Sequence, residues 1–177
     1  MLVVSGPRAV RLVEEVARLG QHAETLGQRQ APDHSVLLLD ARAVLEGADQ
    51  AHLRQAMQRS RRHHALIALD LGPVDWIRAA GGSRAAYHLA AVQPDILFAT
   101  EEAAAELAAP LEGIAPCAVL IGREACVVHG RHLAVPSGAD LDVDAFEAAF
   151  CVALVEGVAP VEAVAQAVLV AAGSPAR

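Results

Sequence analysis

Short apolar runs alternating with longer, helix-like segments constrain this chain most. Runs with the length and composition of buried strands occur at Leu2–Val4, Val36–Leu39, Ala65–Leu69, Ile96–Phe98, Ala118–Ile121 and Cys126–Val128. Helices are expected at Pro7–Leu19, Asp49–Arg62, Ser83–Val92, Glu101–Ala108, Asp144–Glu156 and Pro160–Ala171. This alternation predicts a three-layer α/β fold, in which helices cover both faces of a mostly parallel sheet.

Length and composition narrow the class of protein further. A chain of 177 residues with 54% hydrophobic residues can bury one substantial core, so residues 1–177 are expected to form a single domain. No segment reaches the roughly 18 uninterrupted apolar residues of a membrane span, and the N-terminus lacks a signal-peptide pattern. We therefore expect a cytoplasmic protein that does not bind membranes.

Charge and cysteine content bear on possible partners. The net charge of −7 argues against nucleic-acid binding, which normally needs a basic face. Arg59, Arg61 and Arg62 are interpreted as the solvated end of a helix. The chain has 3 cysteines, an odd number set in apolar runs, which favours free buried thiols. The remaining partner classes are a nucleotide or small-molecule ligand and a homo- or hetero-oligomer.

Polar residues at the ends of three apolar runs predict where a ligand binds. Asp40, Asp70 and Thr100 each follow an expected strand. Ligands of open α/β sheets bind outside the carboxyl ends of the strands, so these residues are expected to mark the edge of a site. The polar stretch Gly20–His34 is interpreted as a linker.

Four segments, taken in order, carry a resemblance to a known family. They are ALIALDLG at 65–72, QPDILFATEEAAAEL at 93–107, AVLIGREA at 118–125 and DAFEAAF at 144–150. The first is similar to a strand that ends in an aspartate in the ribokinase-like (PfkB) carbohydrate kinases. The others resemble that family's "RPDILFPNEEEAAEL", "VVTLGAEG" and the end of "GAGDAFNAGF". The order and spacing of the four segments are more specific than any one of them.

The resemblance implies an ATP-dependent phosphoryl transfer to a sugar hydroxyl, with Mg²⁺ as the metal ion. Asp144 falls on the aspartate that acts as the base for the attacking hydroxyl. Gly122, Asp142 and Val143 fall on positions that line the nucleotide site. Glu101 and Glu102 lie near the family's magnesium-organising positions and are candidate metal ligands.

Several departures from the family pattern point to impaired or absent activity. The three residues before Asp144 are Leu141, Asp142 and Val143, whereas glycines let a phosphate approach the helix start in the family. We expect bulk and negative charge to hinder a phosphate there. The family's magnesium-organising asparagine falls on Thr100.

The N-terminal segment also departs from the family pattern. An alignment without gaps over residues 6–20 places Arg11 on the sugar-binding asparagine. Arginine cannot accept a hydrogen bond from a sugar hydroxyl as asparagine can. The same alignment leaves no room for the segment that forms the family's lid, so we expect the lid to be absent.

Alternatives stay open at this point. Asp144, with Glu147 three residues later, also fits a capping box, in which case its role is structural. The chain as a whole is either a kinase homologue or a non-catalytic binding or regulatory subunit on the same scaffold. A flavodoxin-like domain is a third possibility, which a hairpin at Cys126–Val135 would disfavour. Trp76 and Tyr87, single aromatics on helices, are expected to pack rather than stack on adenine, and His129 and His132 to lie in a solvated turn.

Overall fold

One sheet organises the computed structural model, which describes residues 2–4, 9–21, 23–25, 36–46 and 50–173. Within these residues the sheet has eight strands in the order β2-β1-β3-β4-β5-β6-β7-β8. They are β1 (Leu2–Val4), β2 (Ala23–Thr25), β3 (Val36–Asp40), β4 (Leu66–Asp70), β5 (Ile96–Thr100), β6 (Cys117–Ile121), β7 (Ala125–Val128) and β8 (Arg131–Ala134). Neighbours from β2 to β6 pair in parallel, whereas β7 and β8 are antiparallel.

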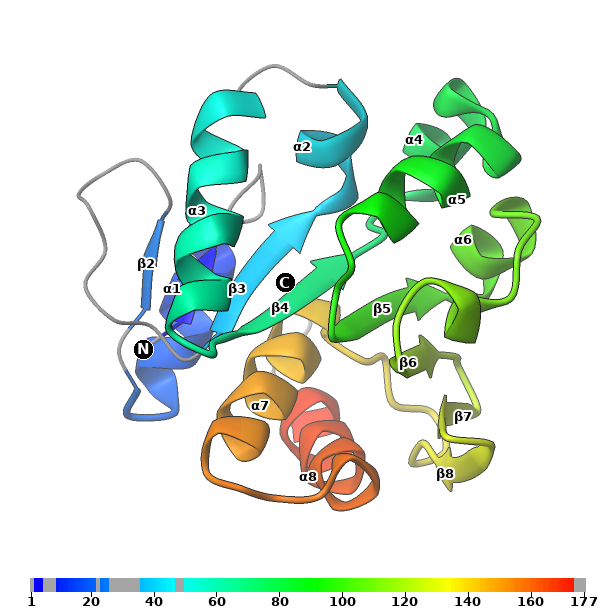
Figure 1. Cartoon of the computed structure of the whole chain (residues 1–177). Coiled ribbons are helices and arrows are strands. Elements are labelled where there is room, and N and C mark those ends of the chain that lie inside the picture. The colour runs from blue at the N-terminus through cyan, green and yellow to red at the C-terminus, as the bar shows by residue number, and fades with distance from the viewer. Residues whose placement is uncertain (1, 5–8, 22, 26–35, 47–49, 174–177) are drawn as a thin grey trace.

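Helices cover both faces of this sheet (Figure 1). They are α1 (Ala9–Arg18), α2 (Ala41–Glu46), α3 (Gln50–Arg62), α4 (Val74–Ala80), α5 (Gly82–Ala91), α6 (Glu101–Glu106), α7 (Val143–Val155) and α8 (Pro160–Gly173), with a 3-10 turn η1 (Leu111–Gly113). Helices α1, α7 and α8 pack on one face and α2 to α6 on the other. The three-layer fold predicted from the alternation of elements is confirmed.

The strands supply both cores because their side chains alternate between the two faces. On β3, Val36 and Leu38 face α1, α7 and α8, while Leu37 and Leu39 face the other helical layer. All five residues of β3 are buried. A strand covered on both faces needs such a continuous apolar run, and this is the pattern from which it was predicted.

The core beneath α7 contains an aromatic cluster. The ring centroids of Phe98 on β5 and Phe150 on α7 lie 5.3 Å apart, with the rings nearly perpendicular. Phe146 lies 6.4 Å from Phe150 and 6.5 Å from Phe98. Edge-to-face pairs of this kind add about 0.5–1.5 kcal/mol to the hydrophobic burial. The cluster packs α7 against β5.

Some elements were not anticipated. β2 lies inside the stretch Gly20–His34, so the linker interpretation is wrong for Ala23–Thr25, and residues 26–34 lie outside the described part. A three-residue edge strand of sequence AET carries no apolar periodicity to reveal it. The helices α2, of 6 residues, and α4, of 7 residues, were also missed, because such short segments barely reveal a helical period. The β7–β8 hairpin, in contrast, was expected: His129 lies in its turn, whereas His132 belongs to β8, and both are exposed.

Two further observations bear on the lid and on membranes. Every strand among the described residues belongs to the single sheet, so none of them forms a separate lid over its edge. Over the same residues, no helix combines the length and apolar character needed to cross a bilayer.

Candidate functional site

The N-terminus of α7 is the centre of the candidate site. Asp142 is the N-cap residue: its carboxylate Oδ1 accepts hydrogen bonds from the backbone N–H groups of Asp144, at 3.1 Å, and Ala145, at 3.2 Å. The capping role considered for Asp144 is therefore wrong, because the helix begins at Val143, two residues earlier than a cap at Asp144 requires. A side-chain carboxylate already occupies the first amides of this helix.

Arg11 on α1 joins the two aspartates at this helix start. Its Nη2 lies 3.1 Å from Oδ2 of Asp142, and its Nη1 lies 3.1 Å from Oδ2 of Asp144. The Arg11 side chain is 55% exposed, whereas that of Asp144 is only 4% exposed. Burying a carboxylate this deeply costs free energy unless a charge partner or hydrogen bonds replace the lost water. Arg11 provides part of that replacement.

The role of Arg11 was not foreseen from the sequence. It was placed on the family's sugar-binding asparagine, but its ion pairs to α7 were not predicted. Arg11 and Asp142 are 131 residues apart in the chain, so no local spacing signals their contact. Leu141 and Val143, expected to crowd a phosphate, are partly buried and pack against the core, and the expected crowding stays a prediction. The Asp142 carboxylate is a further group at the α7 start.

Glu101 and Gly122, predicted for metal and nucleotide binding, lie together at the carboxyl ends of β5 and β6. A β-carbon at Gly122 would lie 2.6 Å from Oε1 of Glu101 and 2.7 Å from the carbonyl oxygen of Ala125. Only glycine fits between a carboxylate and a backbone carbonyl at these distances. The negative charge of Glu101 therefore lies directly against the residue that, by resemblance, lines the nucleotide site.

Glu102, the second candidate metal ligand, is exposed on the first turn of α6. The cap of this helix is Thr100, whose hydroxyl oxygen accepts a hydrogen bond from the N–H of Ala103 at 3.3 Å. Within the described part of the chain, no group of three or more His, Cys, Asp or Glu residues could hold a metal ion. Glu101 and Glu102 thus remain predicted ligands for a magnesium ion whose other ligands would be water and phosphate oxygens.

Asp40 and Asp70, predicted at the site edge, are brought side by side. They are register partners at the ends of the adjacent parallel strands β3 and β4, and both are buried. Oδ1 of Asp40 accepts from the N–H of Arg42 at 2.8 Å, and Oδ1 of Asp70 accepts from the N–H of Gly72 at 2.9 Å. Each carboxylate thereby shapes the turn that follows its strand.

The side chains of Arg42 and Trp76 lie beside these turns, and their contact was not predicted from the sequence. The guanidinium carbon of Arg42 lies 5.8 Å from the ring centroid of Trp76. Gly72 has a φ of +61°, and a β-carbon there would meet the Trp76 ring at 2.4 Å. Trp76 is partly buried, in line with the expectation that it packs, whereas Tyr87 is 75% exposed and the same expectation is wrong for it.

The three cysteines are free thiols in the structure. Burial raises the pKa of Cys126 to about 11, although a hydrogen bond with the Gly122 backbone opposes the shift. Burial also raises the pKa of Cys117. The pKa of Cys151 is raised by burial first and then by the charge of Glu147. A raised pKa lowers the fraction of the reactive thiolate, so burial makes each of the three thiols less reactive.

Comparison with known proteins finds structures of similar fold, but their sequence similarity to this chain is low. No family model and no curated protein sequence matches this chain. Adenosine kinase from Sinorhizobium meliloti superposes with a TM-score of 0.62 at 18% identity, over 78% of this chain and 48% of that one. A sugar kinase from Pyrococcus horikoshii gives a TM-score of 0.60 at 17% identity, over 97% and 73%.

A third structure carries ligands. Aminoimidazole riboside kinase from Salmonella enterica, solved with aminoimidazole riboside and an ATP analogue, gives a TM-score of 0.59 at 12% identity, over 77% of this chain and 55% of that one. The chain spans about half the length of this enzyme and of the adenosine kinase. The three-layer fold is thus similar to the folds of these small-molecule kinases. More specifically, the fold is that of the ribokinase-like carbohydrate kinases.

Proposed function

We propose that this chain is a ribokinase-like (PfkB) carbohydrate kinase homologue in which ATP-dependent phosphoryl transfer to a sugar hydroxyl is impaired or lost. One observation carries the proposal: the Asp142 carboxylate takes the N–H groups of Asp144 and Ala145 at the α7 start. Free amides at a helix N-terminus are what binds a phosphate. Here an internal anion fills that place.

An incoming phosphate would have to displace Asp142 and would meet its charge. Two like charges 4 Å apart repel by about 1 kcal/mol in water and by about 4 kcal/mol at an effective dielectric constant of about 20. The Glu101 carboxylate against Gly122 adds a second negative charge on the nucleotide side. Both effects oppose ATP binding before any chemistry begins.

The catalytic step is hindered as well. A base must present a carboxylate oxygen to the attacking hydroxyl, yet Oδ2 of Asp144 lies 3.1 Å from the Arg11 guanidinium. If activity remains, Asp144 is the base, Gly122, Asp142 and Val143 contact the nucleotide, and Glu101 and Glu102 contact Mg²⁺. The three free thiols fit a reducing compartment such as the cytoplasm, where we place the protein.

Calorimetric titration with ATP, with and without Mg²⁺, tests the proposal on wild type and two variants. Asp142→Gly removes the internal anion, and glycine at an N-cap costs only a few tenths of a kcal/mol, so this variant is expected to fold. Asp140→Gly is the matched control, because Asp140 is exposed and gives no cap hydrogen bond in the structure. We expect ATP to bind only to Asp142→Gly.

A measurement of kinase activity can contradict the proposal. Wild-type protein is incubated with ATP, Mg²⁺ and a panel of pentoses, hexoses and nucleosides, and ADP release is measured. Turnover by wild type that Asp142→Gly does not increase would contradict the proposal that Asp142 impairs the reaction, and its loss in Asp144→Asn would identify Asp144 as the base. Equal ATP affinity of the Asp142→Gly and Asp140→Gly variants would show that charge alone, rather than the occupied amides, controls binding.

A non-catalytic binding or regulatory subunit on the same scaffold is the second candidate. The specific observation in its favour is Tyr87, whose aromatic side chain is 75% exposed on α5. Exposed aromatic residues are enriched at protein interfaces. A stable complex with another protein, in the absence of nucleotide binding by wild type and Asp142→Gly alike, would favour this candidate.

A further inference from the structure

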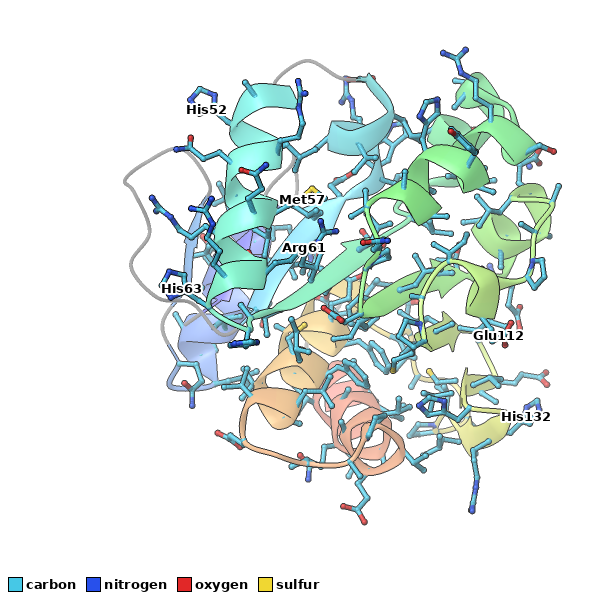
Figure 2. All side chains as sticks on the ribbon, viewed as in Figure 1. His52, Met57, Arg61, His63, Glu112 and His132 are labelled. Atoms are coloured by element: carbon cyan, nitrogen blue, oxygen red, sulfur yellow. The ribbon has the colours of Figure 1, made fainter. Side chains whose placement is uncertain are left out.

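Strand β8 ends the sheet with an edge that no other strand of the described residues covers. It is last in the strand order, and it packs on β7 and α8. Figure 2 shows the His132 side chain of this strand at the rim of the molecule. An edge strand presents backbone N–H and C=O groups with which another chain can pair. The sheet can therefore be extended at β8.

The register of the β7–β8 hairpin decides which backbone groups of β8 point outward. Val135 donates its N–H to the carbonyl oxygen of Glu124 at 2.8 Å, so these two residues form a hydrogen-bonded pair of the antiparallel ladder. Such pairs alternate with pairs whose backbone groups point away from each other. Ala134 and His132 are paired with β7 at these alternate positions. Their N–H and C=O groups therefore face the open edge.

A second copy of β8 fits these groups in antiparallel register. A two-fold axis perpendicular to the sheet at Leu133 places His132 of each copy opposite Ala134 of the other. Both are then hydrogen-bonded pairs, because the outward groups of the two strands face each other. Leu133 lies opposite Leu133 of the second copy, and Arg131 lies opposite Val135. No like charges are opposed in this register, so the edge is self-complementary.

Helix α8 is compatible with the same axis. It packs on β7 and β8, and a two-fold axis perpendicular to the sheet keeps both copies of α8 on one face. Strands lie about 4.8 Å apart, so a helix over the last two strands lies about 5 Å from this axis and about 10 Å from its copy. Packed helices are about 8–10 Å apart. The exposed side of α8 includes Ala165 and Leu169, and Leu169 is 70% exposed. The two helices can therefore bury Leu169 between them.

Charges on this face of the sheet are complementary across the axis. Arg131 lies opposite Val135 of the second copy, and the neighbour of that Val135 on the β7 side is Glu124. Residues opposite each other share a face, and Val135 belongs to the core beneath α7 and α8. Two strand spacings separate Arg131 from Glu124 by roughly 10 Å between Cα atoms, a gap that two long side chains can bridge.

Both charged groups are available for this contact. Arg131 and Glu124 are exposed. Among the ion pairs and hydrogen bonds of side chains in the described part of the chain, none involves either residue. The two-fold axis forms the Arg131–Glu124 contact twice. Charge thus favours a second copy of this chain at the edge.

We propose that the chain forms a dimer in which two β8 strands join the sheets into one and the two α8 helices pack side by side. The interface has a backbone ladder at its centre, the Leu169 side chains on one face and an Arg131–Glu124 pair at each end. This inference does not depend on the proposed function, because it uses none of the candidate site residues.

Sedimentation velocity over a concentration series, combined with a substitution of Ala134, tests the ladder. Proline is tolerated on an edge strand where the N–H faces outward, so Ala134→Pro is expected to keep the hairpin but to lose a hydrogen bond to the second copy. We expect its dissociation constant to rise about tenfold or more. Ala134→Thr keeps the N–H and is the matched control, with an affinity close to wild type. Circular dichroism verifies that each variant is folded.

A substitution of Leu169 tests the helix contact. Leu169→Asp places a charge from each copy between the two helices, and we expect the dissociation constant to rise about tenfold or more. Val10→Asp is the matched control, because Val10 on α1 is 64% exposed and α1 packs on β1 and β2 at the other end of the sheet. It should leave the affinity unchanged.

Charge reversal tests the register. Arg131→Glu and Glu124→Arg are each expected to raise the dissociation constant roughly three- to tenfold, because each change acts twice across the axis. The double variant Arg131→Glu/Glu124→Arg is expected to recover most of the wild-type affinity. Arg84→Glu, on the exposed side of α5, is the control. The wild-type dimer is expected to weaken between about 0.05 M and about 0.5 M salt.

Two results would overturn the proposal. The first is a wild-type monomer at low salt over the whole concentration range. The second is a dimer whose affinity is the same in folded Ala134→Pro and Ala134→Thr, which would place the interface away from β8. ATP titration of the Leu169→Asp variant separates this inference from the proposed function, since loss of the dimer is expected to leave nucleotide binding as it is in wild type.

Discussion

Helices α6 and α7 both begin at the carboxyl edge of the sheet, where the family resemblance puts its functional residues, but their caps differ. α6 is capped by the neutral hydroxyl of Thr100 through one hydrogen bond of 3.3 Å. α7 is capped by the carboxylate of Asp142 through two hydrogen bonds, and Arg11 binds the same carboxylate. One helix start has a neutral cap, and the other holds a built-in anion.

Under the proposed function, the difference teaches how a helix start loses an anion site without loss of the fold. A helix N-terminus favours negative charge whether the anion is a ligand or a side chain. Because Asp142 supplies the negative charge, the helix is stabilised, and its N-terminus attracts an external phosphate less strongly. At α6, Glu101 and Glu102 lie in the first turn and also favour the helix dipole. There the carboxylates do not take the cap position.

Among the substitutions that test the two helix starts, removal of Arg11 is expected to change the free energy of unfolding most. Arg11→Leu leaves the buried Asp144 carboxylate without its ion pair, and we expect the free energy of unfolding to fall by about 1–3 kcal/mol. Urea denaturation followed by circular dichroism measures the change. The double variant Arg11→Leu/Asp144→Leu should recover part of the loss, because the buried charge of Asp144 is removed together with its partner. A change below about 0.5 kcal/mol in Arg11→Leu would mean that water stabilises the Asp144 carboxylate as well as the Arg11 guanidinium does.

A substitution of Gly122 tests the close packing beside the start of α6. Gly122→Ala would place a β-carbon 2.6 Å from Oε1 of Glu101 and 2.7 Å from the carbonyl oxygen of Ala125. The Glu101 side chain can turn away, but the backbone carbonyl cannot, so we expect a loss of about 1–2 kcal/mol in thermal or urea unfolding. Gly113→Ala is the control, since a β-carbon there meets nothing within 4 Å. Equal stability of the two variants would refute the close approach.

The layers of the fold could be predicted from the sequence because they follow from local patterns. The run Val36–Leu39 is uniformly apolar, and only a strand covered on both faces needs that. Phe146 and Phe150 are four residues apart, a spacing that places two side chains on one face of a helix, and they lie in the aromatic cluster with Phe98. The order of the four family-like segments then pointed to the ribokinase-like fold, which the structural comparisons support.

The arrangement of the site could not be predicted, because its contacts are not local. The sequence placed negative charge before Asp144, but not the ion pairs from Arg11, 131 residues away from Asp142. Whether Asp142 or Asp144 caps α7 depends on where the helix begins, and helix boundaries are the least certain part of any pattern. Tyr87 was expected to pack because aromatics usually do, and the orientation of α5 decides otherwise.

Asp142→Ala measures the charged cap itself. It removes both cap hydrogen bonds and one ion pair, and we expect the free energy of unfolding to fall by about 1 kcal/mol. Asp142→Asn keeps a capping oxygen without the charge, so it should lose less than Asp142→Ala in the same urea experiment. If the two substitutions cost the same, the charge rather than the hydrogen bonds stabilises α7.

Thr100→Ala is expected to have the smallest effect, about 0.5 kcal/mol, because a single long hydrogen bond to the Ala103 N–H is lost. Thr100→Asp converts the neutral cap of α6 into the kind found on α7. It should stabilise the helix against urea, although Glu101 and Glu102 lie close enough to repel the new charge. A destabilised Thr100→Asp variant would mean that the acids of α6 already satisfy its dipole. In that case only α7, whose acids are joined by Arg11, has the counter-charge that a carboxylate cap requires.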